Sequence, residues 1–127
     1  MVNVRFLIIS LLLCLVSSCK KEDKNPCQAA EQYYGYLIKG NVEAYVRHIH
    51  DYDQMDEGYR SQLKDMFLQY LDREEQIHGG IVSARALRDT LIDSVEAHVF
   101  VEVQFGDSTS EQVSLPLVRT PKGWMMR

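Results

Sequence analysis

The hydrophobic pattern of this 127-residue chain changes its period once, at the glycine pair Gly79-Gly80. Before the pair, apolar residues recur at steps of three and four positions, which is typical of amphipathic helices. After it they alternate, and this predicts a strand with one covered face, formed by Val95, Ala97, Val99, Val101, Val103 and Phe105. Helices that precede all the strands in sequence favour an α+β domain.

Three helices are predicted before the glycine pair. The first spans about 26–39, because Asn25 and Pro26 form a helix start and Gly40 a stop. The second spans about 41–49, and the third begins between 53 and 58 and ends near 78. The residues expected to face inward are Ala30, Tyr33, Tyr34, Leu37 and Ile38 in the first helix, Val42, Tyr45, Val46 and Ile49 in the second, and Tyr59, Leu63, Met66, Phe67, Tyr70, Leu71 and Ile77 in the third.

About four strands are predicted after the pair, at 81–92, 95–105, 112–119 and 124–127. Pro116 interrupts the third, which indicates a bulge or an edge position, since proline has no N–H to donate to a neighbouring strand. Short turns join the strands, so sequence neighbours are expected to pair antiparallel. Helices gathered at one end of the sequence can then cover one face of the sheet.

The N-terminal stretch has the features of an export signal. Residues 6–16 are eleven positions with one serine among apolar side chains. Such a run is too short to cross a membrane, which takes about 20 residues, but it fits the apolar region of a signal peptide. The segment Val16-Ser17-Ser18-Cys19 then resembles the lipobox of bacterial lipoproteins. The alternatives are an ordinary cleaved signal and a buried helix with an incidental cysteine.

The lipobox resemblance implies diacylglycerol on the Cys19 sulfur and cleavage before Cys19, and two or three acyl chains would anchor the chain firmly. The chain then divides into a signal peptide (1–18), a charged tether (19–25) and one α+β domain (26–127). Cys27 keeps no partner for an intrachain disulfide and is either a small buried hydrophobe or a free thiol.

The charge pattern bears on partners and location. Arg5 is the only charged side chain of 1–18, so cleavage changes the formal net charge from −4 to −5. An acidic chain without a basic block argues against nucleic acid as a partner. The expected location is the bacterial outer membrane. In some Gram-negative lineages acidic residues after the lipidated cysteine direct export to the surface, and Cys19-Lys20-Lys21-Glu22-Asp23 resembles that pattern. A plain solvated tether is the alternative, so the periplasmic face and the cell surface both stay open.

Several features of the mature part occur together in one known fold. They are a tyrosine-rich first helix, Lys39-Gly40-Asn41 before a short second helix, a long third helix, and a sheet that ends in Thr120-Pro-Lys-Gly-Trp-Met-Met-Arg127. The combination resembles the cystatin-like cone fold of the nuclear transport factor 2 (NTF2) and ketosteroid isomerase superfamily, and its small secreted lipoproteins in particular. The resemblance implies helices packed on a curved antiparallel sheet. The superfamily includes isomerases, dehydratases, transport factors and non-enzymatic modules, so this fold does not by itself select a function.

Two groups of residues could carry chemistry. The stretch from His48 to Asp53 holds two histidines and two aspartates, which zinc accepts as ligands. Residues two apart on a helix point about 200° from each other, so His48 and His50 can share a metal only if the helix has ended there. A polar helix end is the interpretation adopted, and no metal site is predicted. On the strand at 95–105, Glu96, His98 and Glu102 lie opposite the covered face. No catalytic residue and no cofactor is therefore predicted.

The candidate ligand-binding residues are Tyr33, Tyr34 and Trp124, although aromatic residues at helical spacing are more often core. Phe100 and His98 are the candidate interface residues, on a sheet face that could form a homodimer. We expect a lipid-anchored protein of the cell envelope that binds a small ligand or another envelope protein without catalysis. The alternatives are a cone-fold enzyme of isomerase or hydratase type, and a structural or inhibitory module that acts through the sheet face.

Overall fold

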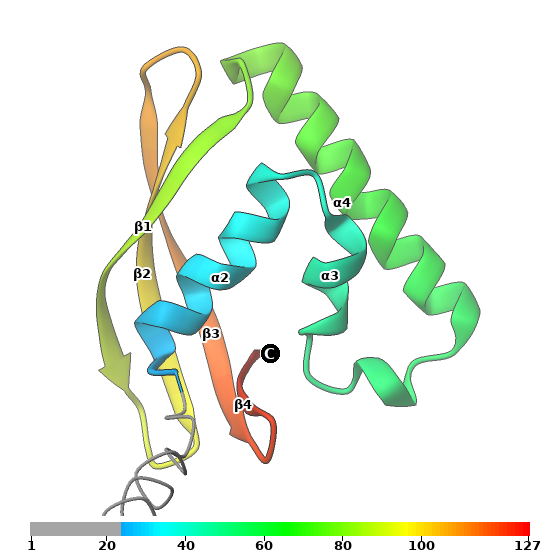
Figure 1. Ribbon diagram of the computed structural model, residues 1–127, viewed down its shortest axis with the longest axis vertical. Helices are drawn as coiled ribbons and strands as arrows, with labels where there is room; N and C mark the ends of the chain where they lie inside the picture. Colours follow the sequence, from blue (N-terminus) through cyan, green and yellow to red (C-terminus); the bar gives the residue numbers. More distant parts are fainter. Residues whose placement is uncertain (1–23) are drawn as a thin grey trace, which may run out of the picture.

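The computed structural model describes residues 24–127, which form helices followed by a four-stranded antiparallel sheet (Figure 1). The helices are α2 (Pro26–Ile38), α3 (Val42–Arg47) and α4 (Glu57–His78), with a 3-10 turn, η1 (Tyr52–Gln54), before α4. The strands, which neighbour one another in sequence order, are β1 (Ile81–Leu91), β2 (Glu96–Phe105), β3 (Ser110–Thr120) and β4 (Gly123–Met126). The predicted α+β class is confirmed.

The predicted signal peptide and the lipidation site Cys19 lie outside the described residues. Within residues 24–127, no helix is long and apolar enough to cross a membrane.

A side chain caps the start of each of the three helices α2, α3 and α4. Asn25 accepts a hydrogen bond from the N–H of Gln28 at 2.8 Å, and the Gln28 side chain accepts one from the N–H of Asn25 at 3.1 Å. This reciprocal pair is a capping box, which satisfies two N–H groups that the helix itself leaves free. Asn41 and Asp56 each accept from the N–H three positions further on. The caps predicted at Asn25 and Asn41 are confirmed.

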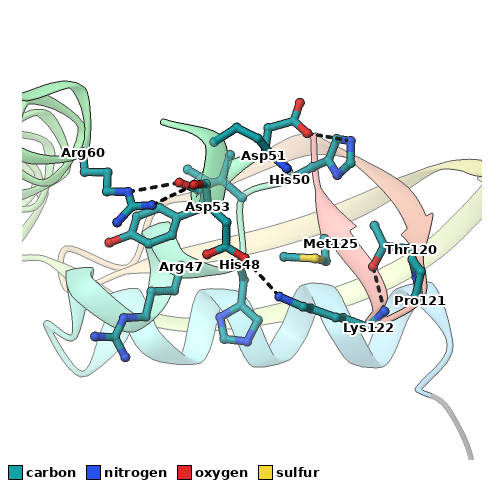
Figure 2. A pocket seen from close by; sticks show the side chains of 13 residues that line it. Arg47, His48, His50, Asp51, Asp53, Arg60, Thr120, Pro121, Lys122 and Met125 are labelled. Atoms are coloured by element: carbon teal, nitrogen blue, oxygen red, sulfur yellow. Dashed lines mark hydrogen bonds and ion pairs between the residues drawn. The ribbon is translucent and has the colours of Figure 1, made fainter. Parts of the chain in front are cut away.

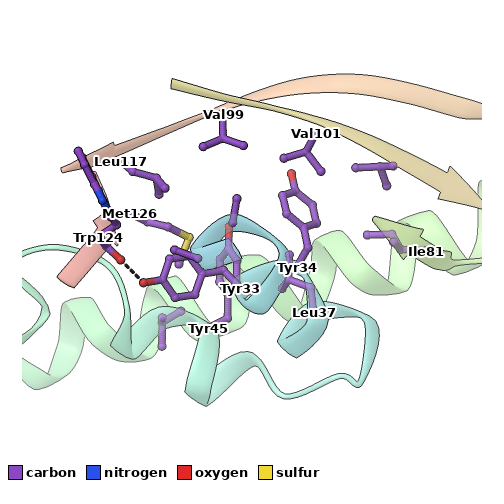
Figure 3. Packing of buried hydrophobic residues seen from close by; sticks show 14 of the residues in the cluster. Tyr33, Tyr34, Leu37, Tyr45, Ile81, Val99, Val101, Leu117, Trp124 and Met126 are labelled. Carbon is purple, nitrogen blue, oxygen red and sulfur yellow. Dashed lines mark hydrogen bonds between the residues drawn. The ribbon is translucent and has the colours of Figure 1, made fainter. Parts of the chain in front are cut away.

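The core lies between α2, α3 and the covered face of β2 (Figure 3). Val46, Val99 and Val101 have no exposed surface. Full burial of such a side chain contributes roughly 1.5–3 kcal/mol. The buried residues are Ala29, Ala30, Tyr33, Tyr34, Leu37, Val42, Tyr45, Val46, Ile81, Ala97, Val99, Val101, Val103, Phe105, Leu117, Trp124 and Met126. The alternation predicted for 95–105 is therefore confirmed from Ala97 onward, whereas Val95 is exposed in the turn before β2.

Helix α4 departs from the expected inward stripe. None of its residues is fully buried, and Tyr59, Met66 and Ile77 are 49%, 52% and 62% exposed. The helix packs against α3 and the start of β1 and diverges from the rest of the sheet (Figure 1). Only one side of its apolar stripe meets the core, where Phe67 contacts the ring of Tyr45 edge-on at 4.7 Å between ring centroids.

Hydrogen bonds join the C-terminal end of α4 to the β2–β3 turn. The N–H of Gly106 donates to the carbonyl of Gly80 at 2.9 Å, and the N–H of Asp107 donates to the carbonyl of His78 at 2.8 Å. The Asp107 carboxylate accepts hydrogen bonds from Thr109 and from Nδ1 of His78. These bonds hold the pKa of Asp107 down, at about 2.

Pro116 lies in the inner strand β3 without a bulge, next to the place where β4 ends, so the predicted bulge or edge position is wrong. The β2–β3 pairing runs without a register shift, and the shifts lie in β1 instead, between Ile81 and Ser83 and between Ala86 and Arg88. The Pro116 carbonyl accepts from the N–H of Arg127, so the backbone of Pro116 faces away from β2. Its missing N–H therefore costs no bond to β2.

Candidate ligand-binding site

A pocket lies between the end of α3 and the β3–β4 turn (Figure 2). Its volume is about 750 Å³. Residues 47–54 line one side, 120–122 and Met125 line the other, and Arg60 of α4 closes one end. The stretch from His48 to Asp53, which the sequence singled out for its polar side chains, therefore borders this pocket.

A backbone bridge to β4 positions the loop on the first side of the pocket. Ile49 pairs in parallel with Met126 as an isolated bridge. The N–H of His50 donates to the carbonyl of Met126 at 2.5 Å, and the N–H of Met126 donates to the carbonyl of His48 at 2.9 Å. Asp51 then takes a left-handed conformation, with φ of +70°. This conformation is less unfavourable for aspartate than for most residues, and it turns the chain into η1.

Arg60 fixes the far end of the loop. Its Nε donates to the carbonyl of Tyr52 at 3.0 Å, and its Nη2 donates to the carbonyl of Asp53 at 3.1 Å. The guanidinium also lies over the Tyr52 ring, 4.3 Å from the centroid. A guanidinium has five N–H donors, so three stay available after these two bonds. Because the two acceptors are neutral carbonyls, they do not neutralise the charge of Arg60.

Each of the two carboxylates at the pocket has a basic neighbour. Asp53 accepts from Nζ of Lys122 at 3.1 Å, an ion pair that joins η1 to the β3–β4 turn (Figure 2). Asp51 lies 3.2 Å from Nε2 of His50. The side chains of Asp53 and Asp51 are 71% and 61% exposed, so water screens both pairs and each is weak.

His48 of the pocket contacts both α2 and α3. Its Nδ1 lies 2.7 Å from the carbonyl oxygen of Ala44, which can only accept, so Nδ1 carries the proton. Its ring stacks on Tyr36 at 5.4 Å and tilts against Tyr33 at 5.0 Å. In Figure 2 the ring points toward α2. Within residues 24–127, no group of three or more His, Cys, Asp or Glu side chains is placed to hold a metal ion.

The candidate ligand-binding tyrosines Tyr33 and Tyr34 lie in the core rather than along this pocket (Figure 3). The Tyr33 hydroxyl donates to the carbonyl of Trp124. Burial, with a smaller effect of Tyr36, raises the pKa of Tyr33 to about 12. Burial also raises the pKa of Tyr34. Both hydroxyls therefore stay protonated at neutral pH, and ligand binding by these tyrosines stays a prediction.

Trp124 is the one candidate of the three that borders a pocket. The second pocket, of about 340 Å³, lies between Trp124, Arg119 and the chain entering α2 at Lys24 to Pro26. The guanidinium of Arg119 lies 4.9 Å from the centroid of the Trp124 ring. The indole itself is buried, so this pocket offers a ligand little aromatic surface.

The candidate interface residues His98 and Phe100 alternate along β2 with the buried residues Ala97, Val99 and Val101, so they lie on the sheet face opposite the core. Phe100 is partly buried there, beneath the guanidinium of Arg88 at 4.5 Å from the ring centroid. His98 lies opposite Pro116 of β3. A homodimer through this face stays a prediction. Cys27 is partly buried against the core, with its thiol free.

Comparison with known proteins identifies the fold. A solved structure of a Campylobacter jejuni protein, provisionally described as an NTF2-like transpeptidase, aligns with a TM-score of 0.63 at 15% identity. The alignment covers 81% of this chain and 97% of that one. The domain therefore has an NTF2-like α+β fold, as the resemblance implied. No model of a known protein family matches the chain, and a search of curated proteins gave no match either.

Proposed function

We propose that this chain is a lipid-anchored protein of the bacterial cell envelope whose NTF2-like domain binds a small anionic ligand without catalysis. The anchor is supported by the apolar run 6–16 and the Val16-Ser17-Ser18-Cys19 segment. Its test is the intact mass of the chain purified from membranes. The expected mass is that of residues 19–127 plus acyl groups, and a Cys19→Ser chain should lack the addition.

The observation that carries the binding proposal is the unmatched charge of Arg60. Its two hydrogen bonds go to neutral carbonyls, and within residues 24–127 it forms no ion pair, whereas Asp53 is paired with Lys122. A carboxylate or phosphate of the ligand could take the remaining N–H donors of Arg60, since a planar guanidinium fits both groups. It could also displace the exposed Asp53 from Lys122 at little cost.

Binding is favoured over catalysis because the carboxylates of this pocket are solvated. Isomerases of this fold class use a carboxylate in a dehydrated site, where burial tunes its pKa. Asp51 and Asp53 lie at the exposed rim instead, and the buried cluster of residues 24–127 contains no charged residue. The enzyme alternative would have to rely on a histidine of the pocket, His48 or His50, rather than on a buried carboxylate.

The test is a thermal-shift titration of the full chain in detergent with small carboxylates and phosphates. A ligand at 100 times its dissociation constant stabilises the folded state by about 2.7 kcal/mol. The shift should be lost in Arg60→Gln and reduced in Lys122→Met. It should persist in Arg73→Gln, a matched control on the exposed part of the same helix. An Arg60→Gln chain that responds like the wild type would contradict the proposal.

A further inference from the structure

The turn between β1 and β2 exposes three large apolar side chains. Leu91, Ile92 and Val95 are 63%, 53% and 47% exposed, although a surface turn of this kind is normally polar. We refer to these three residues as the β1–β2 tip. Exposed apolar side chains that gather in a patch rimmed by polar residues mark contacts with a partner or a membrane.

The β1–β2 tip is held in shape by its own hydrogen bonds. Oδ1 of Asp93 accepts from the N–H of Val95 at 2.7 Å and from the N–H of Glu96 at 2.8 Å. The N–H of Ile92 donates to the carbonyl of Glu96 at 2.9 Å. Glu96 is paired with Arg127 at 2.8 Å. Both carboxylates at the turn therefore have partners, which lowers the cost of bringing it to a less polar medium.

The β1–β2 tip lies at the end of the domain where the described chain begins. In Figure 1 the turn and the first residues of α2 lie together, at the end opposite the β2–β3 turn. Burial raises the pKa of Cys27, which lies in the first turn of α2. The negative charges of Asp89, two residues before the tip, and of Glu31 raise it further. The carbonyl of Val95 accepts from the N–H of Arg119, which borders the same pocket as Lys24.

The length of the tether limits how far this end can be from the anchor. Five residues separate Cys19 from Asn25. Even a fully extended chain covers at most about 3.6 Å per residue, so Asn25 stays within roughly 20 Å of an acylated Cys19. A lipid on Cys19 would therefore hold the end of the domain that carries the β1–β2 tip next to the membrane surface.

We propose that the β1–β2 tip inserts into the lipid surface that anchors Cys19 and so fixes the orientation of the domain on the membrane. This inference rests on the lipid anchor of the proposed function. Apolar side chains that enter the boundary between headgroups and acyl chains add to the binding of an acyl anchor. The bound domain would then point the C-terminal end of α4 and the β2–β3 turn away from the membrane (Figure 1).

The test uses the acylated full chain in phosphatidylcholine vesicles, with and without brominated acyl chains that quench tryptophan. Ile92→Trp places the probe in the β1–β2 tip. The matched control is Ile77→Trp, which is also exposed, at 62%, but lies at the opposite end of the domain. The wild type gives the background of Trp124, the single natural tryptophan. We expect the added fluorescence of Ile92→Trp to be largely lost on brominated vesicles, and that of Ile77→Trp to be unchanged.

Two results would overturn the inference, and they differ in cause. A chain that carries the acyl mass but shows equal quenching of Ile92→Trp and Ile77→Trp would refute the insertion alone, because the anchor would be present. A chain whose mass lacks acyl groups would refute the anchor and the insertion together. The intact mass is read on the same preparation, so the two cases are distinguished in one experiment.

Discussion

The substitution of glycine by alanine is expected to change stability in opposite directions at two positions of this domain. Gly106 begins the β2–β3 turn, where an ideal Cβ would lie 2.4 Å from the carbonyl oxygen of Gly79 and 3.0 Å from its carbonyl carbon. Both atoms are backbone, and the bonds from Gly106 to Gly80 and from Asp107 to His78 hold them in place. Because no side-chain rotation relieves this clash, we expect Gly106→Ala to lose about 2 kcal/mol, within the ~1–3 kcal/mol typical of overpacking.

Gly35 provides the matched control. It lies inside α2, and a Cβ added there would meet no atom within 4 Å. Alanine is more favourable than glycine in a helix interior by roughly 0.5–1 kcal/mol, mostly because the unfolded glycine has more conformational freedom to lose. We therefore expect Gly35→Ala to stabilise the domain by about that amount.

Urea denaturation of residues 20–127, followed by far-ultraviolet circular dichroism, measures both changes. In a thermal scan each kcal/mol corresponds to about 4–8 °C for a domain of this size. The diagnostic result is the opposite sign of the two variants. A Gly106→Ala chain as stable as the wild type would refute the close approach of the two backbones, and with it this attachment of α4 to the sheet.

Two further predictions concern hydrogen bonds to titratable groups. Tyr33→Phe removes the donor to a buried carbonyl of β4 and should destabilise the domain by about 1–3 kcal/mol in the same denaturation assay. Tyr45 is equally buried but makes no such bond, so Tyr45→Phe should stay within about 0.5 kcal/mol of the wild type. Asp107 has a folded pKa of about 2, against an ordinary 3.8, through its bonds to Thr109 and His78. Its stabilising effect is therefore complete above about pH 4 and lost as the pH falls toward 2. The difference in unfolding free energy between the wild type and Asp107→Asn should shrink over that interval. A constant difference would contradict the lowered pKa of Asp107.

The sequence was most informative where local chemistry decides the structure. Asn25 and Asn41 mark the helix starts because a capping side chain acts on an N–H three residues away. The alternation from Ala97 to Phe105 reports one covered face directly, since every second side chain points the same way. These signals need no knowledge of distant residues, and they sufficed for the element order and the α+β class.

The pattern failed for α4 and for the pocket because both depend on contacts between distant segments. Tyr59 and Met66 have the right spacing for a buried stripe, but spacing does not say whether another element is there to cover it. The stretch from His48 to Asp53 is polar, and its local pattern indicates only a helix end. Its place in the pocket follows from the bridge between Ile49 and Met126, and nothing local to either segment indicates that pairing.

The same long-range contacts constrain when the domain can close. The hydrogen bond from Tyr33 to the carbonyl of Trp124 spans 91 residues of sequence, and Ile49 meets its partner Met126 across a similar interval. A growing chain can form its helices early, but α2 and the pocket loop lack these partners until the ribosome has released the strand β4. During synthesis the chain therefore stays open along its core until β4 has left the ribosome.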